Sequence, residues 1–169
     1  MNALNCFKDA KRVVVKVGTS TLTYETGLIN IRRRGGLGRG RGARRKAGRE
    51  IVRGPAGAVG VGVGKLGRQE KPADMPTKQA AAAVGQSELM YLYDRNFSRW
   101  GHPTGQVLLT KDIVGDAARR QNVINTFDRL LALGAVPIVN ENDTISFEEI
   151  EFGDNDTLSA IVAELIGAD

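Results

Sequence analysis

Short β-branched runs alternate with amphipathic helical patterns along this chain, and that alternation constrains its fold more than any other feature. Residues 12–20 begin with a run of valines and end in Gly and hydroxyl residues, which is typical of a buried strand that opens into a loop. Ile51 and Val52 indicate a second, short strand. Residues 104–110 and 135–140 predict two more.

Helical patterns lie between and after these strands. Residues 77–97 are rich in good helix formers and follow Pro76, which favours a helix start. Residues 119–133 carry their apolar side chains on one helical face, and Gly134 is placed as a C-terminal stop. A further amphipathic helix is predicted over residues 155–167. We expect residues 57–64 to form a glycine-rich turn and residues 144–152 a hairpin.

The order of strands and helices predicts an α/β fold, with a largely parallel sheet flanked by helices and right-handed crossovers. The 169 residues, 41% of them hydrophobic and 25% charged, suffice for one soluble domain with a proper core. Ligands of such sheets bind at the carboxyl ends of the strands. Four segments follow predicted strands and should line that edge, namely residues 16–20, 57–64, 110 and 140–143.

Lys16 is the lysine at a strand end on this edge, beside Gly18, Thr19 and Ser20. Backbone N–H groups of such a turn favour anions, and a nearby ammonium group is what phosphoryl transfer needs. The motif alone is equally compatible with a surface lysine at the end of a strand.

Two loops dense in Asn and Asp flank the predicted hairpin, and they point to a polar ligand. Asp143, Asp154 and Asp156 would repel one another in a low-dielectric pocket and would need a compensating cation. A substrate ammonium group, a lysine or a magnesium ion would serve. Loops of this composition also occur as ordinary turns and helix caps.

The charge of the chain is unevenly distributed. The net charge is +5, but residues 32–54 contribute +9 and the remainder therefore carries −4. A basic protein suggests nucleic acid as a partner, whereas this mildly acidic body argues against it. Cys6 can form no internal disulfide, the N-terminus has no signal-peptide core and no apolar run reaches membrane-spanning length. We expect a cytoplasmic protein without a membrane partner.

Other motifs carry little weight. Gly62-Val-Gly-Lys-Leu-Gly67 matches a dinucleotide fingerprint but is followed by prolines in place of an immediate helix. The lone His102 lies in a predicted turn, and no cluster of Cys and His indicates zinc or another protein-bound metal.

Five motifs resemble the glutamate 5-kinases of the amino-acid kinase superfamily, across nearly the whole chain except residues 32–56. They are Val13-Val-Val-Lys-Val-Gly-Thr-Ser20, Lys78-Gln-Ala-Ala-Ala-Ala-Val-Gly-Gln86, Gln106-Val-Leu-Leu-Thr110, Pro137-Ile-Val-Asn-Glu-Asn-Asp143 and Gly153-Asp-Asn-Asp-Thr-Leu-Ser-Ala160.

The resemblance implies ATP-dependent phosphorylation of the γ-carboxylate of L-glutamate, the first step of proline synthesis, with Mg²⁺ carried by the nucleotide. It implies that Lys16 stabilises the transferring phosphoryl group. It places the glutamate site at Asp143 and Asn155, with Asn140, Asp154 and Asp156 nearby. Proline is then a candidate feedback inhibitor, and we expect a homo-oligomer.

The chain departs from the family's pattern in two places. A serine that contacts glutamate in the family falls at Ala56, within an Arg- and Gly-rich stretch over residues 32–56. We interpret that stretch as the product of a shifted reading frame, with a genuine RNA-binding arm as the alternative. The chain also stops before the family's nucleotide-binding half. We therefore interpret residues 1–169 as the amino-acid-binding portion of one kinase domain, and we expect this portion to be inactive alone. The alternative is that the chain is part of an acetylglutamate or aspartate kinase.

Overall fold

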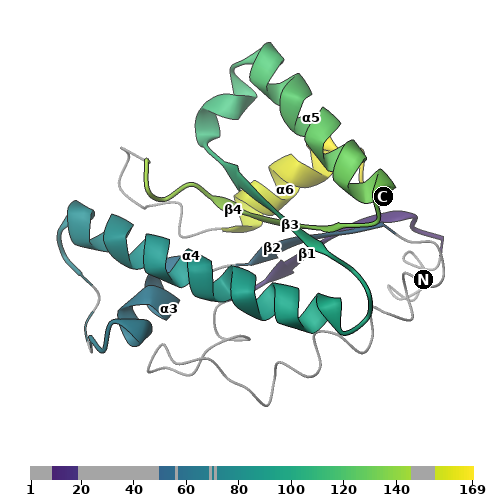
Figure 1. The fold of residues 1–169 in the computed structure, drawn as a ribbon. Coiled ribbons are helices and arrows are strands. Elements are labelled where there is room, and N and C mark those ends of the chain that lie inside the picture. Colours follow the sequence, from purple (N-terminus) through teal and green to yellow (C-terminus); the bar gives the residue numbers. More distant parts are fainter. Residues whose placement is uncertain (1–8, 19–49, 56, 69, 71, 146–154) are drawn as a thin grey trace, which may run out of the picture.

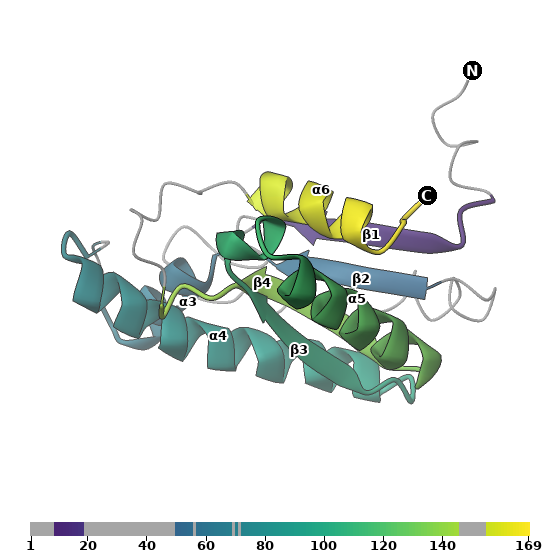
Figure 2. The ribbon, with the colours of Figure 1, turned by 90° about the horizontal axis from the view of Figure 1, so that it is seen from above.

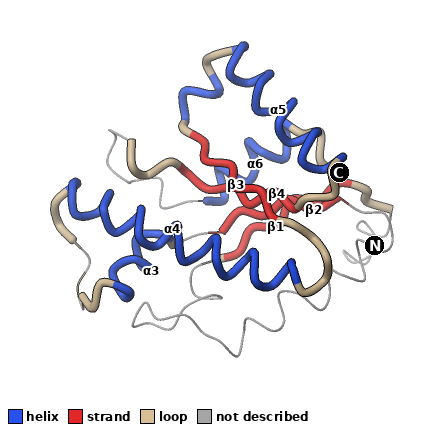
Figure 3. The backbone as a smooth tube through the Cα atoms, viewed as in Figure 1, coloured by secondary structure: helices blue, strands red, loops and turns tan. Residues whose placement is uncertain are grey.

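A four-stranded sheet lies between two layers of helices in the computed structural model of this chain (Figures 1 and 3). The structure describes residues 9–18, 50–55, 57–68, 70, 72–145 and 155–169. Helices α3 and α4 cover one face of the sheet, and α5 and α6 cover the other. The elements in chain order are β1 (Arg12–Val17), β2 (Glu50–Pro55), α3 (Ala58–Lys65), α4 (Met75–Ser98), β3 (Thr104–Leu109), the 3₁₀ helix η2 (Lys111–Val114), α5 (Ala117–Ala132), β4 (Val136–Glu141) and α6 (Asn155–Leu165).

All neighbouring strands of this sheet are parallel, and their order is β1-β2-β4-β3. The register pairs Lys16 with Gly54 and Arg53 with Ile138, so the ends of β1, β2 and β4 lie level with one another. The predicted α/β class with a parallel sheet is therefore confirmed. The strand predicted from Ile51 and Val52 also exists, and is longer than those two residues indicated.

Each face of the sheet has its own apolar core, because successive side chains of a strand point to opposite faces. On one face, Val15 and Val17 of β1 and Ile138 of β4 pack against α3 and α4. On the other face, Val14 and Val139 pack against α5 and α6. The central strand β4 is buried along Val136–Asn140, as predicted from its continuous apolar run.

Local signals place the ends of α4, α5 and α6 within two residues of the predicted ones. The Asp74 carboxylate accepts a hydrogen bond from the backbone N–H of Thr77 at 2.9 Å and so caps α4, with Pro76 in its first turn. Asp116 caps α5 in the same way. Gly134 has a φ of 80°, in the left-handed region that ends helices, and it separates α5 from β4.

The glycine-rich turn predicted over residues 57–64 is wrong, because Ala58–Lys65 form helix α3. Only Gly57, with a φ of 95°, takes a turn conformation, where it joins β2 to that helix. Alternating Val and Gly have poor helix propensity. Packing against α4 outweighs that preference, and it is a tertiary interaction that local sequence does not reveal.

The contact between α3 and α4 is made by backbone against backbone. A Cβ atom added to Gly62 would lie 1.8 Å from the carbonyl oxygen of Ala81, and one added to Gly85 would lie 1.8 Å from that of Ala58. Each helix therefore presents an Ala and a Gly four residues apart, and these small residues let the two helices touch. Gly62, the first glycine of the apparent dinucleotide fingerprint, thus serves this packing.

Arg12 joins four elements at the opposite, amino-terminal edge of the sheet. Its Nε lies 2.6 Å from Glu50 Oε2 of β2, and its Nη1 lies 3.1 Å from Asp128 Oδ1 of α5 and 2.6 Å from the carbonyl oxygen of Ile166, just after α6. Asp169 accepts hydrogen bonds there from the backbone N–H groups of Lys11 and Arg12. This edge thus provides structural anchoring.

Two sequence predictions concern other parts of the chain. The hairpin predicted over residues 144–152 lies almost wholly outside the described residues, as does most of the Arg- and Gly-rich stretch over residues 32–56. Of the helices that the structure describes, none is long and apolar enough to cross a membrane.

Replacing Gly85 with Ala should destabilise the protein, although Gly to Ala inside a helix ordinarily stabilises it by about 1 kcal/mol. The new methyl group would overlap the Ala58 carbonyl and force α3 away from α4. We expect a loss of about 2–3 kcal/mol in the free energy of unfolding, measured by urea denaturation. Ser87→Ala, at an exposed position of the same helix, is the control. A Gly85→Ala variant as stable as the wild type would contradict the close contact.

Candidate functional site

The carboxyl ends of the strands and the start of α6 meet at one edge of the sheet. In Figure 2 the arrowheads of β1 and β2 point to the side on which α6 begins. This arrangement follows from the parallel pairing, since every strand that returns in the same direction ends at the same edge. Most of the predicted site residues therefore come from segments that gather here.

Lys16 reaches the start of α6 from β1. Its Nζ lies 2.7 Å from Oδ1 of Asp156, and the two side chains are 34% and 61% exposed. An acidic residue in the first turn of a helix also interacts favourably with the helix dipole. An exposed ion pair of this kind contributes little to stability. Its importance is geometric, because it joins two of the predicted site residues.

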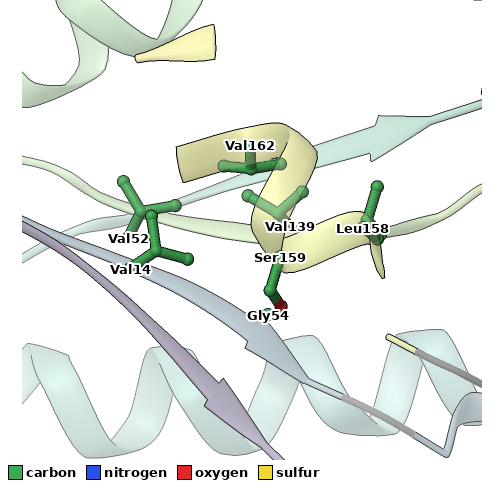
Figure 4. Close-up of a pocket in the computed structure, with 7 residues that line it drawn as sticks. All are labelled: Val14, Val52, Gly54, Val139, Leu158, Ser159 and Val162. Atoms are coloured by element: carbon green, nitrogen blue, oxygen red, sulfur yellow. The ribbon is translucent and has the colours of Figure 1, made fainter. Parts of the chain in front are cut away.

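Helix α6 approaches the sheet closely because Gly54 of β2 has no side chain. A Cβ atom at Gly54 would lie 3.0 Å from Ser159 Oγ, and Figure 4 shows the Ser159 side chain directed toward this glycine. The crevice around them is almost entirely apolar and too tight for a water molecule. We regard it as a packing seam that places the start of α6 beside Lys16. Its lining residues are Val14, Val52, Gly54, Val139, Leu158, Ser159 and Val162.

Asp143 lies just beyond β4 in an environment that disfavours its charge. Burial, with the nearby charge of Glu141 as a second cause, raises the pKa of Asp143 to about 6. Among the residues that the structure describes, no basic side chain pairs with it. Asp156 has an ammonium partner in Lys16, whereas the half-buried carboxylate of Asp143 has none in the described part of the chain.

The turn that carries Asp143 is organised by its neighbour Asn142. The Asn142 N–H donates to the carbonyl oxygen of Leu109 at 2.8 Å, and its side-chain oxygen accepts from the Thr144 hydroxyl at 2.6 Å. Asn142 thus acts as an ordinary turn residue, which was the alternative for these loops. Asp143 has no such local hydrogen bond within the described part of the chain.

Asn140 lies in β4, and its side chain faces α4. Its side chain is 3% exposed, and its Nδ2 donates a hydrogen bond to Oε1 of Gln86 at 2.7 Å. Lys16 and Asn140 therefore lie on opposite faces of the sheet near one edge. A ligand that contacted both would have to lie across the carboxyl end of β2, between β1 and β4.

Several predicted site residues cannot be placed. Thr19, Ser20, Ala56 and Asp154 lie outside the described residues. Two others are located through their backbone: Gly18 directly follows β1, and Asn155 is the first residue of α6. The roles of all these residues remain predictions.

Two residues near the edge were not singled out from the sequence. Glu141 raises the pKa of Asp143, and only the turn after β4 brings these two carboxylates together. Gln86 holds Asn140. The sequence does contain a signal for Gln86, because it interrupts a stripe of otherwise small or apolar residues on α4.

Curated relatives of this chain are glutamate 5-kinases. That of Clostridium perfringens is 52% identical over 166 residues, which is 96% of this chain and 62% of the relative. That of Moorella thermoacetica is 54% identical over 161 residues, 95% of this chain and 43% of the relative. That of Clostridium tetani is 48% identical over 168 residues, 99% of this chain and 63% of the relative. The chain thus spans 43–63% of the lengths of these relatives.

The family match agrees with the α/β fold of the chain, in which parallel strands are flanked by helices. The profile of the amino acid kinase family matches residues 11–169. This chain therefore belongs to the amino acid kinase family.

Proposed function

We propose that this chain is the amino-acid-binding part of a glutamate 5-kinase, which transfers the γ-phosphoryl group of ATP to the γ-carboxylate of L-glutamate. Its similarity to curated glutamate 5-kinases supports the substrate. The observation that carries the proposal is the meeting of Lys16 with the acidic start of α6, 2.7 Å apart, at the sheet edge where Asp143 also lies. That edge offers positive charge to a phosphoryl group and negative charge to an ammonium group.

The carboxylate of Asp143, which has no basic partner among the described residues, supports an amino acid as the ligand. A half-buried carboxylate with a raised pKa gains most from a cation that binds beside it, because the cation restores its charged form. The α-ammonium group of glutamate is such a cation. We propose that Asp143 binds it, with Asn140, Asp154, Asn155 and Asp156 around the bound amino acid and Ala56 where relatives are expected to carry a contact serine.

The proposed reaction requires charge stabilisation rather than a base. A γ-carboxylate with a pKa near about 4.3 is ionised at neutral pH. One of its oxygens attacks the γ-phosphorus of ATP, an O–P bond forms, the bond to the β,γ-bridging oxygen breaks and ADP leaves. The products are glutamyl 5-phosphate and ADP. Lys16 would neutralise charge on the transferring group, and the Gly18-Thr19-Ser20 turn would donate backbone N–H groups to phosphate oxygens.

A glutamate 5-kinase is also expected to have a particular cofactor, pathway, location and regulation. ATP would arrive with Mg²⁺, which offsets phosphate charge, and the product would enter proline biosynthesis. We propose a cytoplasmic homo-oligomer that proline regulates by occupying the glutamate site. The −4 charge outside residues 32–54 does not favour nucleic acid as a partner.

The proposal predicts hydroxamate formation from glutamate, because hydroxylamine traps an acyl phosphate as it forms. The longer protein that contains this sequence should produce γ-glutamyl hydroxamate with ATP, whereas the 169-residue chain alone should not. Acetylglutamate and aspartate are the matched substrates. Equal or faster hydroxamate formation from either one would identify a different kinase of the family, and turnover by the 169 residues alone would refute the proposed division of labour.

Lys16→Met should lower kcat of the longer protein by about 10²–10³-fold, since it removes the charge beside the transferring phosphoryl group. The dissociation constant for L-glutamate should change much less, measured by calorimetry. Lys65→Met is the matched control, because Lys65 also forms an ion pair, with Glu88 of α4, and is not one of the predicted site residues. A Lys16→Met enzyme that retained wild-type kcat would exclude the proposed role.

Binding of L-glutamate should weaken as the pH falls through about 6, because protonation of Asp143 removes the partner of the ammonium group. The dissociation constant measured from pH 5 to 7.5 should show this step, and Asp143→Asn should bind weakly at every pH without it. The γ-carboxylate of glutamate titrates well below this window.

Asp143→Asn should weaken glutamate binding but stabilise the ligand-free protein. The pKa of Asp143 in the folded state lies above its ordinary value, so the folded state holds a proton that the unfolded state has already released. The stabilisation that this proton provides is lost as the pH rises through about 6. Asp143→Asn should therefore raise the melting temperature of the ligand-free protein above pH 6 and leave it little changed near pH 4. A uniform loss of stability would indicate a structural role for the carboxylate.

A further inference from the structure

Gln86 is a polar residue at a position where α4 otherwise faces the core. The residues of α4 that lie on the same stripe are small or apolar and are buried, and Gln86 falls between them at helical spacing. They are Ala82, Leu89, Tyr93 and Phe97. A residue of similar size without polar atoms, such as Met, would suit that stripe, so the carboxamide needs another explanation.

The carboxamide of Gln86 has one partner, and this partner is Asn140. Its Oε1 accepts the 2.7 Å hydrogen bond from Asn140 Nδ2, while its buried Nε2 finds no acceptor among the described residues. A buried donor without an acceptor is destabilising. The pair therefore adds little to stability, although it fixes how the Asn140 side chain is turned.

The backbone beside Gln86 cannot shift easily. Gly85 touches Ala58 of α3 so closely that not even a methyl group fits between them. The position of Gln86 along the sheet is consequently set by a helix–helix contact, and β4 sets the position of Asn140. Two rigid elements thus hold the two amide groups against each other.

The hydrogen bond leaves one polar atom of Asn140 without a partner. With Nδ2 occupied by Gln86, Oδ1 of Asn140 accepts no hydrogen bond from any residue that the structure describes. An amide oxygen can only accept, so its complement on an amino acid is the ammonium group. A carboxylate of the same amino acid would be repelled by it.

We propose that Gln86 is a positioning residue, which holds the carboxamide of Asn140 so that its oxygen is directed to the ammonium group of the bound amino acid. This inference rests on the proposed function, because it assumes an amino acid as the ligand. Gln86 itself contacts no substrate. It acts by preventing the Asn140 side chain from turning its NH₂ group toward the ligand.

Gln86→Met in the longer protein tests this inference. Met preserves the volume and removes both polar atoms of the carboxamide, so Asn140 becomes free to rotate. We expect KM for L-glutamate to rise roughly ten- to a hundredfold, the effect of losing a hydrogen bond to a charged group. KM for ATP and kcat should remain within about threefold, since the lost interaction is a binding interaction.

The melting temperature separates positioning from a structural role. The substitution removes one buried donor without an acceptor, Gln86 Nε2, and creates another, Asn140 Nδ2, so the stability should change little. Gln121→Met is the matched control, because Gln121 also forms a side-chain hydrogen bond with an Asn, at 2.9 Å to Asn125, on the exposed surface of α5. Its kinetic constants should equal those of the wild type.

Glutarate, which lacks the ammonium group, identifies the atom that Asn140 recognises. Its inhibition constant should be the same for wild type and Gln86→Met, whereas KM for glutamate rises. Equal increases for both compounds would overturn the assignment to ammonium, and an unchanged KM for glutamate would overturn the positioning role.

A spectroscopic readout distinguishes failure of this inference from failure of the proposed function. In protein labelled with ¹⁵N-asparagine, the Asn140 side-chain amide signals, assigned with Asn140→Asp, should be protected from solvent exchange and should lose that protection in Gln86→Met. Protection that persists in the variant would refute the inference. A wild-type protein that shows this protection but does not phosphorylate glutamate would refute the proposed function alone.

Discussion

The parallel direction of all four strands is the constraint on which this site depends. Because β1, β2 and β4 end at one edge, residues that are far apart in the sequence come together there. Lys16 and Asp156 are separated by 140 positions and lie 2.7 Å apart. Antiparallel pairing of β1 with β2 would place Lys16 beside the start of β2, at the edge where Arg12 now anchors the fold.

The site straddles the sheet, and glycine contacts hold it on both faces. On one face, Gly54 lets α6 approach until Asp156 meets Lys16. On the other face, Gly62 and Gly85 let α3 and α4 touch, which sets Gln86 beside Asn140. The second contact is backbone against backbone, and the first joins the Gly54 backbone to the short Ser159 side chain, so both leave little room for adjustment. This precision would suit the proposed site, in which a small substrate must be aligned with a phosphoryl group.

The carboxylates near this edge divide into two kinds by their surroundings. Asp156 is exposed, lies in the first turn of a helix and has the Lys16 ammonium group as its partner. Asp143 is half-buried, lies near another acid and has a raised pKa. The first has its counter-charge within the protein, whereas the second has none among the residues that the structure describes. In the proposed site, Asp156 would therefore orient Lys16 and Asp143 would bind the ammonium group of the substrate.

Local patterns were enough to predict the α/β class, the four strands and three of the helices, with a helix start at Pro76 and a helix stop at Gly134. Buried runs, helical periodicity and turn residues are properties of neighbouring positions, so the sequence shows them directly. The Asp143 and Asp156 loops could be recognised for the same reason. Helix α3, the amide pair of Gln86 with Asn140 and the contrast between the two aspartates required the folded chain. Each of these depends on a contact with a distant element, namely α4 for the glycines of α3, β4 for Gln86 and β1 for Asp156, and no local pattern encodes which surfaces will meet.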